Sequence, residues 1–565
     1  MKSPLASHSH EIIVFLIAII FFAAMSYFVV LAHSGNFLKF SSPDESANYF
    51  FSRLYAETGN LTLFEPRNLI ATDLIHTRSI RSDYGVLKPV SFLGLPLLYG
   101  SLGALIGVWV LPYLTPFLAS LGILFFYFFL IKIFDKTTAL VASFFLAVFP
   151  IYGYYTAHAL FHNVPFFVFF IAGMSCAVRM ADTSRIRALF FSGAGGIFFG
   201  LALAMRTSEA LWLIPTLLLC AILYIRKIGV LRLALGTTFL VAVLSMIGAW
   251  NTVLYGSPLA GGYPGMNESI AVINATPQTL ASSFVAQNWS AVNEAAHRLK
   301  EALFPLGLNG DLAFRRAYQY GVLMFPWLAL LAALGFLLRF RCWREHGYTL
   351  AVYGASVALF SIILILYYGS WTFYENQNAP TLTVGNSYLR YWLPIYAALL
   401  PFAAFCICAG AQWVSGIVNG WLRVALRTMI SAGIIGAIAF VSLSFLLNDP
   451  GEGLLKFLER QERAREEYSA VLQKTEERAI IITRYHDKLF FPERSVIVGS
   501  LDIPDIVSAY AALAQKIPLY YYNFAFSPED IHYLNTRRLA RFGLEIEPTD
   551  VAVDRFRLYR LRTAQ

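Results

Sequence analysis

The feature that most constrains this chain is a series of long apolar runs through its first 450 residues. Each run is roughly 16–21 residues long, close to the length that an α-helix needs to cross a bilayer. We identify eleven runs: Ile12–Ala32, Leu111–Ile131, Thr138–Tyr155, Ala159–Val178, Ala188–Met205, Ala210–Ile225, Leu233–Trp250, Val322–Leu338, Tyr348–Tyr368, Tyr391–Gly410 and Met429–Leu447. The sequence therefore predicts a polytopic α-helical membrane protein with about eleven transmembrane helices.

The composition agrees with a membrane protein. Of the 565 residues, 58% are hydrophobic and only 14% are charged, whereas soluble domains carry about 25% charged residues. The net charge of +9 does not indicate nucleic-acid binding, because the basic residues cluster in short loops between apolar runs. The first run has no small-residue cleavage site after it, so we interpret it as a retained helix. The five cysteines show no spacing typical of a metal site or a disulfide framework.

Basic residues predict the orientation of the helices. Lysines or arginines follow each even-numbered run, for example Lys132, Arg185, Lys227, Arg344 and Arg423. Short cytoplasmic loops are enriched in such residues, so we expect a cytoplasmic N-terminus and an extracytoplasmic C-terminus in a plasma or inner membrane. A further apolar stretch, residues 90–107, is broken by proline and glycines. Counting it as a span would destroy the charge pattern, so we expect it to lie in the interface or to dip partway.

The same pattern divides the chain into two expected domains. Residues 1–450 form the membrane domain, with external loops at 33–89, 251–320 and 369–390. Residues 451–565 change composition abruptly: a charged helical stretch is followed by short strand-like runs and further helical segments. This alternation predicts a small extracytoplasmic α/β domain. The C-terminal segment contains no nucleotide-binding fingerprint. In the chain as a whole, most polar residues that could take part in chemistry lie in the segments predicted to be outside.

Two adjacent carboxylates, Asp44 and Glu45, follow the first apolar run. They could supply a general base or hold a metal. The sequence also fits a helix start, because Ser42, Pro43 and Glu45 stand at the N-cap, first and third positions of a capping box. Both interpretations can hold together, with the cap orienting Glu45 while Asp44 points into a cavity.

Two arginines lie at predicted outer ends of spans. Arg206 ends the fifth run, where a lipid phosphate or the nearby Glu209 could match its charge. Arg390 opens the tenth run beside Tyr391 and could grip a phosphate bidentately. Aromatic residues around Arg390 also suit an interfacial belt. Ligand-binding and structural roles therefore remain open for both arginines.

His162 and Asn163 stand where the fourth run starts from the outer side. Polar residues inside a spanning segment are costly in lipid, so they mark a candidate functional position. A single histidine in such a place is nevertheless often structural.

Taken in order, these pieces resemble the GT-C superfamily of membrane glycosyltransferases, which includes protein O-mannosyltransferases and the aminoarabinose transferase of lipid A. The resemblance covers roughly residues 10–450. It is carried by Asp44-Glu45, by residues 88–100, by the helix Gly200–Arg206, and by the external segments 251–258 and 304–307. The late motif Arg390-Tyr391-x-x-Pro394 completes the set.

The resemblance implies a transfer, with inversion, from a polyprenyl-phosphate sugar to an extracytoplasmic protein, lipid or glycan. Asp44 would then be the catalytic base, with Glu45 beside it. Arg206 and Arg390 would steady the carrier phosphate, and Tyr391, His162 and Asn163 would line the substrate site. The partners implied are the lipid-linked sugar, the acceptor and membrane lipid, with no nucleic acid.

One departure from the resemblance concerns metal binding. Many relatives place a second acidic residue at the external start of the fourth helix, where this chain has His162-Asn163. This departure argues against a metal bridging two carboxylates. A divalent metal stays an open alternative beside the lipid-linked sugar donor. A shifted substrate or an inactive relative would also fit this departure.

Two other classes of function remain as alternatives. A secondary transporter usually shows inverted repeats and broken helices near the membrane midplane, and we find neither pattern in the sequence. A non-catalytic membrane scaffold is the second alternative. Transporters also tend to bury carboxylates within the membrane, whereas the carboxylates of this chain gather at the outer edge of the spans.

Overall fold

A computed structural model describes residues 9–33, 37–181, 183–305, 307–341, 347–373 and 382–564. The chain divides into two compact units. The helical unit comprises Met1–Val29, Tyr113–Ala260 and Pro264–Lys456. The mixed unit comprises Val30–Pro112, Gly261–Tyr263 and Phe457–Gln565.

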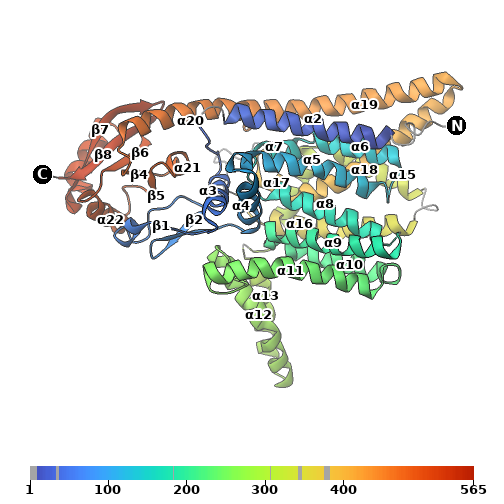
Figure 1. The fold of residues 1–565 in the computed structure, drawn as a ribbon, viewed down its shortest axis with the longest axis horizontal. Coiled ribbons are helices and arrows are strands. Elements are labelled where there is room, and N and C mark those ends of the chain that lie inside the picture. Colours follow the sequence, from blue (N-terminus) through green and yellow to red (C-terminus); the bar gives the residue numbers. More distant parts are fainter. Residues whose placement is uncertain are drawn as a thin grey trace. The chain divides into compact units, whose positions relative to one another are not determined.

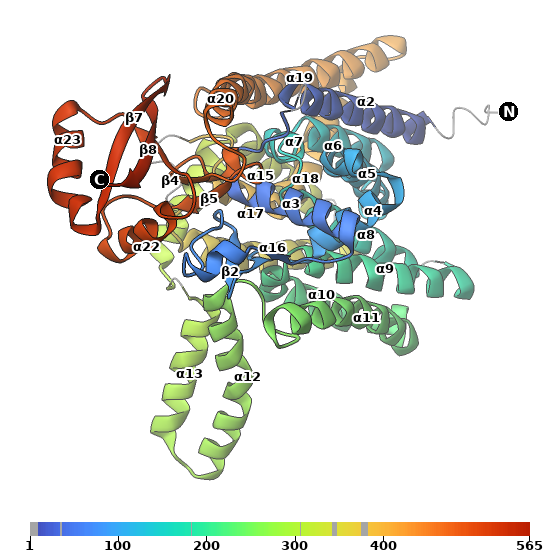
Figure 2. The same cartoon turned by 60° about the vertical axis from the view of Figure 1, so that its left-hand side comes forward.

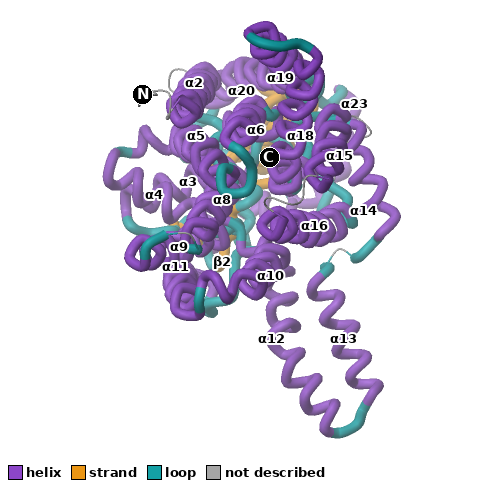
Figure 3. Tube along the Cα trace, turned by 90° about the vertical axis from the view of Figure 1, so that its right-hand side faces the viewer, coloured by secondary structure: helices purple, strands orange, loops and turns teal. Residues whose placement is uncertain are grey.

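The helical unit is a bundle of long apolar helices, seen side-on in Figure 1 and end-on in Figure 3. Among the described residues, nine helical spans are long and apolar enough to cross a membrane. They are built on α2 (Ser9–Ala32), α5 (Leu111–Leu130), α8 (Asn163–Met180), α9 (Arg185–Met205), α10 (Ala210–Ile228), α11 (Val230–Tyr255), α16 (Gly347–Gly369), α18 (Leu393–Val414) and α19 (Trp421–Asn448). The protein is thus an integral membrane protein.

Two further spans are broken rather than continuous. Helices α6 (Lys136–Val148) and α7 (Pro150–Ala157) meet at a bend of 49°. Residues 310–323, which contain α14 (Gly310–Ala317), meet α15 (Pro326–Arg341) at a bend of 92°. In each case a proline opens the second helix, and proline cannot donate the backbone hydrogen bond that would continue the first. If each bent pair counts as one span, the described residues contain eleven, which is the predicted number. The bends themselves were not predicted from the sequence.

The long loop between α11 and α14 contains two helices, α12 (Pro264–Val285) and α13 (Trp289–Leu303). They run side by side and project from the bundle, as Figures 2 and 3 show. Both helices lie within residues 251–320, the segment predicted from the sequence as an external loop.

The mixed unit begins with α3 (Pro43–Thr58), followed by a small antiparallel sheet of β1 (Leu63–Phe64), β3 (Val86–Pro89) and β2 (Ile80–Asp83). Helix α4 (Gly94–Ile106) comes next and corresponds to the interrupted apolar stretch. With 13 residues it is too short to span a bilayer, in agreement with the expectation. It packs closely on α3, because a Cβ on Gly100 would lie 2.8 Å from the Ser52 carbonyl oxygen.

The C-terminal part of this unit is a five-stranded sheet with strand order β5-β4-β6-β8-β7. The strands are β4 (Ile480–Thr483), β5 (Ser495–Val498), β6 (Leu519–Phe524), β7 (Leu544–Val553) and β8 (Phe556–Thr563). The first three pair in parallel, and β8 and β7 add antiparallel. The helices around the sheet are α20 (Leu454–Lys474), α21 (Asp487–Phe490), α22 (Pro504–Ala514) and α23 (Pro528–Tyr533).

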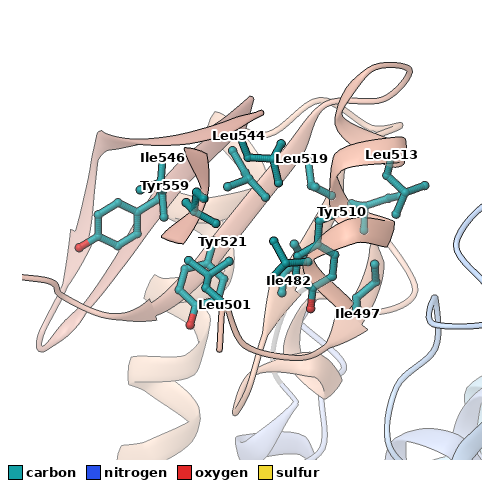
Figure 4. Close-up of a cluster of buried hydrophobic side chains, with 14 of the residues drawn as sticks. Ile482, Ile497, Leu501, Tyr510, Leu513, Leu519, Tyr521, Leu544, Ile546 and Tyr559 are labelled. Carbon is teal, nitrogen blue, oxygen red and sulfur yellow. The ribbon is translucent and has the colours of Figure 1, made fainter. Parts of the chain in front are cut away.

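Strands β4, β5 and β6 lie within the predicted strand-like runs at residues 479–485, 495–500 and 517–524, and β8 overlaps a fourth predicted run at 555–561. The prediction of a small C-terminal domain rich in strands is thus confirmed. Its core contains Ile482, Tyr510 and Leu519, shown with their neighbours in Figure 4. Strand β7, in which Glu and Asp interrupt the apolar residues, and helix α22 were not predicted from the sequence.

A segment of the first external loop belongs to this core. Ala71 and Ile75 are buried in the same cluster as the C-terminal strands, and Ile75 forms an isolated β-bridge with Ile497 of β5. The domain boundary at residue 450 stays a prediction, since the compact units join residues 30–112 to the C-terminal sheet.

Candidate active site

The two predicted carboxylates open α3 in the geometry that the sequence indicated. The Ser42 hydroxyl accepts a hydrogen bond from the Asp44 backbone N–H at 3.2 Å. The Glu45 carboxylate accepts one from the Ser42 backbone N–H at 3.1 Å, with Pro43 in the first turn. These contacts complete the predicted capping box, which satisfies backbone donors at the helix start. Glu45 is buried and serves this cap.

Asp44 has different surroundings from its neighbour. It is half-buried, and its Oδ1 accepts a hydrogen bond from the Ser79 hydroxyl at 2.5 Å. Ser79 lies in the turn before β2 with a φ of +65°. One carboxylate thus belongs to the helix cap, and the other remains partly accessible and is oriented by a single hydroxyl. Of the two, Asp44 is the better placed to take a proton from a substrate.

Two residues of α21 contact the segments on either side of Asp44, one at Ser41 and the other at Arg78. The Lys488 ammonium donates to the Ser41 carbonyl oxygen, just before the cap. The Arg78 guanidinium, next to Ser79, pairs with the buried Asp487 at 2.5 Å, and its backbone N–H donates to the same carboxylate at 3.0 Å. Burial lowers the pKa of Lys488, which its neighbour Asp487 partly offsets. The C-terminal domain therefore fixes the segment that carries Asp44.

In the helical unit, Arg206 caps the C-terminal end of α9 and is buried. Its Nε donates to Glu209 Oε1 at 2.9 Å, and its Nη2 donates to the Tyr368 hydroxyl at 3.2 Å. Trp212 and Tyr368 also donate to the Glu209 carboxylate, at 2.5 and 2.7 Å. The structure thus supplies the salt bridge that was one of the two roles left open. A buried pair of this kind needs such additional hydrogen bonds to offset its desolvation.

Arg206 is also linked to the second predicted arginine through aromatic rings. Its guanidinium lies 4.8 Å from the centre of the Tyr391 ring, and that ring stacks on Tyr368 with 4.2 Å between centroids. The guanidinium of Arg390 lies 5.1 Å from the centres of both the Tyr391 and Phe161 rings. Arg390 Nη2 donates to the Tyr391 hydroxyl at 3.3 Å. Both guanidinium groups therefore contact the Tyr391 ring.

The remaining predicted residues lie at the start of α8. His162 is the N-cap and Asn163 the first helical residue, and both are buried. Asn163 Nδ2 donates to the Arg390 carbonyl oxygen in a long hydrogen bond of 3.4 Å. The short helix α17 (Ser387–Tyr391) that carries Arg390 is thereby attached to α8.

The structure brings four predicted residues into one cluster of the helical unit: Asn163, Arg206, Arg390 and Tyr391. His162 adjoins them in sequence, whereas Asp44 and Glu45 lie in the mixed unit. Sequence reasoning missed Tyr368 and Phe161 around the arginines, and Ser79, Arg78, Asp487 and Lys488 around Asp44. Their polar contacts join residues that lie up to 447 positions apart, so no local pattern could have indicated them.

Within the described ranges, no group of three or more His, Cys, Asp or Glu side chains gathers closely enough to hold a metal ion. A partly accessible carboxylate such as Asp44 can exchange a proton with a substrate, and the guanidinium groups of Arg206 and Arg390 can contact an anion.

Comparisons with known proteins complete the description. Residues 105–253 match the family model described as dolichyl-phosphate-mannose-protein mannosyltransferase. The fold is similar to the crystal structure of ArnT from Cupriavidus metallidurans in the apo state, with 13% identity and a TM-score of 0.55. That similarity covers 96% of this chain and 97% of ArnT. No curated protein matches this chain in sequence.

The fold is also similar to the oligosaccharyltransferase of Archaeoglobus fulgidus. A structure tethered with an acceptor peptide has 12% identity and a TM-score of 0.53, over 93% of this chain and 70% of that one. A structure of the oligosaccharyltransferase AglB from Archaeoglobus fulgidus in complex with an inhibitory peptide and a dolichol-phosphate has 11% identity and a TM-score of 0.52, over 92% of this chain and 70% of that one. At these identities the likeness shows a shared fold.

Proposed function

Because this chain has the fold of the GT-C superfamily of membrane glycosyltransferases, we propose that it moves a sugar from a polyprenyl-phosphate carrier to an acceptor outside the cytoplasm. The observation that carries the proposal is the pair of acidic residues at the start of α3. Glu45 is occupied by the helix cap, while Asp44 is partly accessible and is oriented by Ser79. That division of roles suits a single general base.

In the proposed reaction, Asp44 accepts the proton of an acceptor hydroxyl or amine. The acceptor atom attacks the anomeric carbon from the face opposite the phosphate. The bond between that carbon and the phosphate oxygen breaks, and the polyprenyl phosphate leaves with the electron pair. The configuration of the sugar is inverted. A positioned base typically contributes 10²–10⁴-fold to such a step.

The arginine cluster provides positive charge for the leaving phosphate. Arg206 and Arg390 are both proposed to contact this phosphate, and Glu209 also pairs with Arg206. The Tyr391 ring contacts both guanidinium groups and is proposed to help position them. His162 and Asn163 adjoin this cluster and are proposed to line the same substrate site. Electrostatic stabilisation of the leaving group is often a large part of catalysis.

The comparisons add two lines of support. The matched family model is described by a dolichyl-phosphate-mannose donor, and one similar structure contains a dolichol-phosphate. Both facts belong to those proteins, and they favour a lipid-linked donor here. The acceptor stays open among protein, lipid and glycan.

The test follows label from a radiolabelled polyprenyl-phosphate sugar into cell-envelope extract, with purified full-length protein. Asp44→Asn should slow the transfer at least a hundredfold. Ser79→Ala should cost less, because it removes only the hydrogen bond that orients Asp44. Glu57→Gln, an exposed residue on the same helix, is the matched control and should retain activity.

Three results would count against the proposal in different ways. Equal rates for wild type and Asp44→Asn would remove Asp44 as the base. Equal losses in Asp44→Asn and Glu57→Gln would indicate a folding defect. If wild-type protein consumes none of a broad panel of lipid-linked sugars, a transport or scaffold function would replace the transferase.

A further inference from the structure

The helical unit contains a cavity of about 460 Å³. None of the candidate active-site residues is among the described residues that line it. Its walls come from α5, α8, α9, α10, α11 and α16. Cavities of this size fall within the range of known small-molecule sites. Most of the lining is aliphatic or aromatic, so the cavity suits a hydrocarbon chain better than a polar solute.

Two pairs of closely packed helices, α9 with α11 and α10 with α16, line this cavity. Helices α9 and α11 approach through Gly196 and Gly236, since a Cβ on Gly196 would lie 2.0 Å from the Gly236 carbonyl oxygen. On the facing side, α10 and α16 meet where Cys220 Sγ lies 3.3 Å from Ser356 Oγ. The four residues named here all line the cavity. It therefore lies between two closely packed helix pairs.

The charged groups of the lining are all basic. Lys132, Lys227 and Arg232 line the cavity, and no Asp or Glu does so among the described residues. The Arg232 guanidinium donates to the Met180 carbonyl oxygen at 2.7 Å. The Lys227 ammonium lies 5.6 Å from the centre of the Tyr224 ring, another lining residue.

These cations lie at one end of the bundle. Lys132 follows α5, Lys227 ends α10 and Arg232 begins α11. Met180 ends α8, so the contact of Arg232 with it places Arg232 near the start of α9. Arg206 follows the opposite end of that 21-residue helix, about 30 Å away along its axis. The basic end of the cavity and the arginine cluster are thus separated by about one membrane thickness.

From this geometry we infer that the cavity binds an anionic glycerophospholipid from the leaflet on its basic side, which the loop charges predict to be cytoplasmic. The phosphate contacts Lys132, Lys227 and Arg232, and an acyl chain fills the apolar cavity. Basic pockets between transmembrane helices at the cytoplasmic side are suited to lipid headgroups. The bound lipid is distinct from the sugar donor and bridges the α9–α11 and α10–α16 pairs.

The test uses full-length protein in detergent, depleted of lipid by extended washing. Phosphatidylglycerol is added, with phosphatidylcholine of the same acyl chains as the zwitterionic control. Native mass spectrometry counts bound lipid, and thermal unfolding reports stabilisation. We expect phosphatidylglycerol to bind saturably and to raise the unfolding midpoint. Its affinity should be at least tenfold higher than that of phosphatidylcholine. Equal binding of the two lipids would overturn the inference.

Paired variants separate the headgroup from the chain. Lys227→Gln with Arg232→Gln should weaken phosphatidylglycerol binding at least tenfold. Arg226→Gln, a neighbouring cation outside the lining, should leave it unchanged. Ala221→Trp should block the acyl chain, whereas Ile222→Trp, on the exposed face of α10, should not. All variants must unfold at wild-type temperature without added lipid. Equal effects within either pair would refute the assigned contacts.

Two further ligands test the source of the phosphate. Inorganic phosphate should not stabilise the protein, because it cannot fill the apolar cavity. Undecaprenyl phosphate should not displace phosphatidylglycerol at equal concentration. Displacement would assign the cavity to the carrier lipid and overturn the inference, while leaving the test of Asp44 unaffected.

Discussion

Asp44 and Glu45 are adjacent in the chain, yet contacts from distant residues give them different surroundings. Glu45 closes the helix cap that Ser42 begins. Asp44 meets Ser79, whose neighbour Arg78 is fixed by Asp487 of the C-terminal domain. The chemical difference between two identical functional groups therefore arises from the fold. Arg206 shows the same effect. Its charge is paired with Glu209, whose carboxylate also accepts hydrogen bonds from Trp212 and Tyr368.

Breaking the Arg206–Glu209 pair should destabilise the helical unit strongly. Glu209→Gln would leave a buried guanidinium without its carboxylate, a change that typically costs about 3–5 kcal/mol. Glu57→Gln removes the partner of the exposed Arg53 and should cost about 1 kcal/mol or less. Denaturant unfolding in detergent measures both. Similar costs would mean that Arg206 does not depend on Glu209.

Glu65 should make the stability of the mixed unit depend on pH. Burial tends to raise its pKa, but hydrogen bonds and charge from Arg67, with help from Ser495, hold it below the usual 4.5. The ionised form is thus favoured in the folded state. Its stabilising contribution is complete above the unfolded pKa and is lost as the pH falls through the lower folded value.

The measurement compares unfolding free energies of wild type and Glu65→Gln between pH 3 and 7. The difference should be constant above about pH 5 and should shrink below about pH 4.3. Arg67→Gln removes the main cause of the shift and should abolish this dependence. A difference that grows as the pH falls would contradict the assignment.

At the scale of single elements, short local patterns predicted where helix α3 starts but not where membrane helices bend. The capping box at Ser42 specified where α3 begins, since the pattern involves only four neighbouring residues. The bends at Pro150 and Pro326 were not detected. Proline is tolerated within membrane helices when neighbours satisfy the freed backbone groups, so its presence alone does not locate a bend.

The cap should have a measurable energetic role. Ser42→Ala removes the hydroxyl that accepts from the Asp44 backbone N–H and should lower the stability of the mixed unit by about 1 kcal/mol. Ser42→Thr retains a capping oxygen and should stay near wild type. Hydrogen exchange at the first turn of α3 is the direct measurement. Equal exchange in both variants would show that the cap does not limit the helix start.

For the whole molecule, the eleven spans and the alternation of basic loops predict opposite sides for the two ends of the membrane domain. A reporter enzyme that is active only outside the cytoplasm should be active when fused after Gln565. The same reporter inserted after Gly229, between α10 and α11, should be inactive. The reverse pattern would invert the predicted orientation and move the proposed chemistry to the cytoplasmic side.

The sequence by itself determined the class of fold, the number of spans and the start of α3. Each of these depends on hydrophobic length or on residues a few positions apart, and such signals are local. The residues of the arginine cluster were also recognisable individually. Only the tertiary structure decided that Glu209 pairs with Arg206, that both guanidinium groups contact the Tyr391 ring and that α21 fixes the segment carrying Asp44. It also decided that loop residues Ala71 and Ile75 complete the C-terminal core. These contacts join residues far apart in the chain, so packing rather than local propensity selects them.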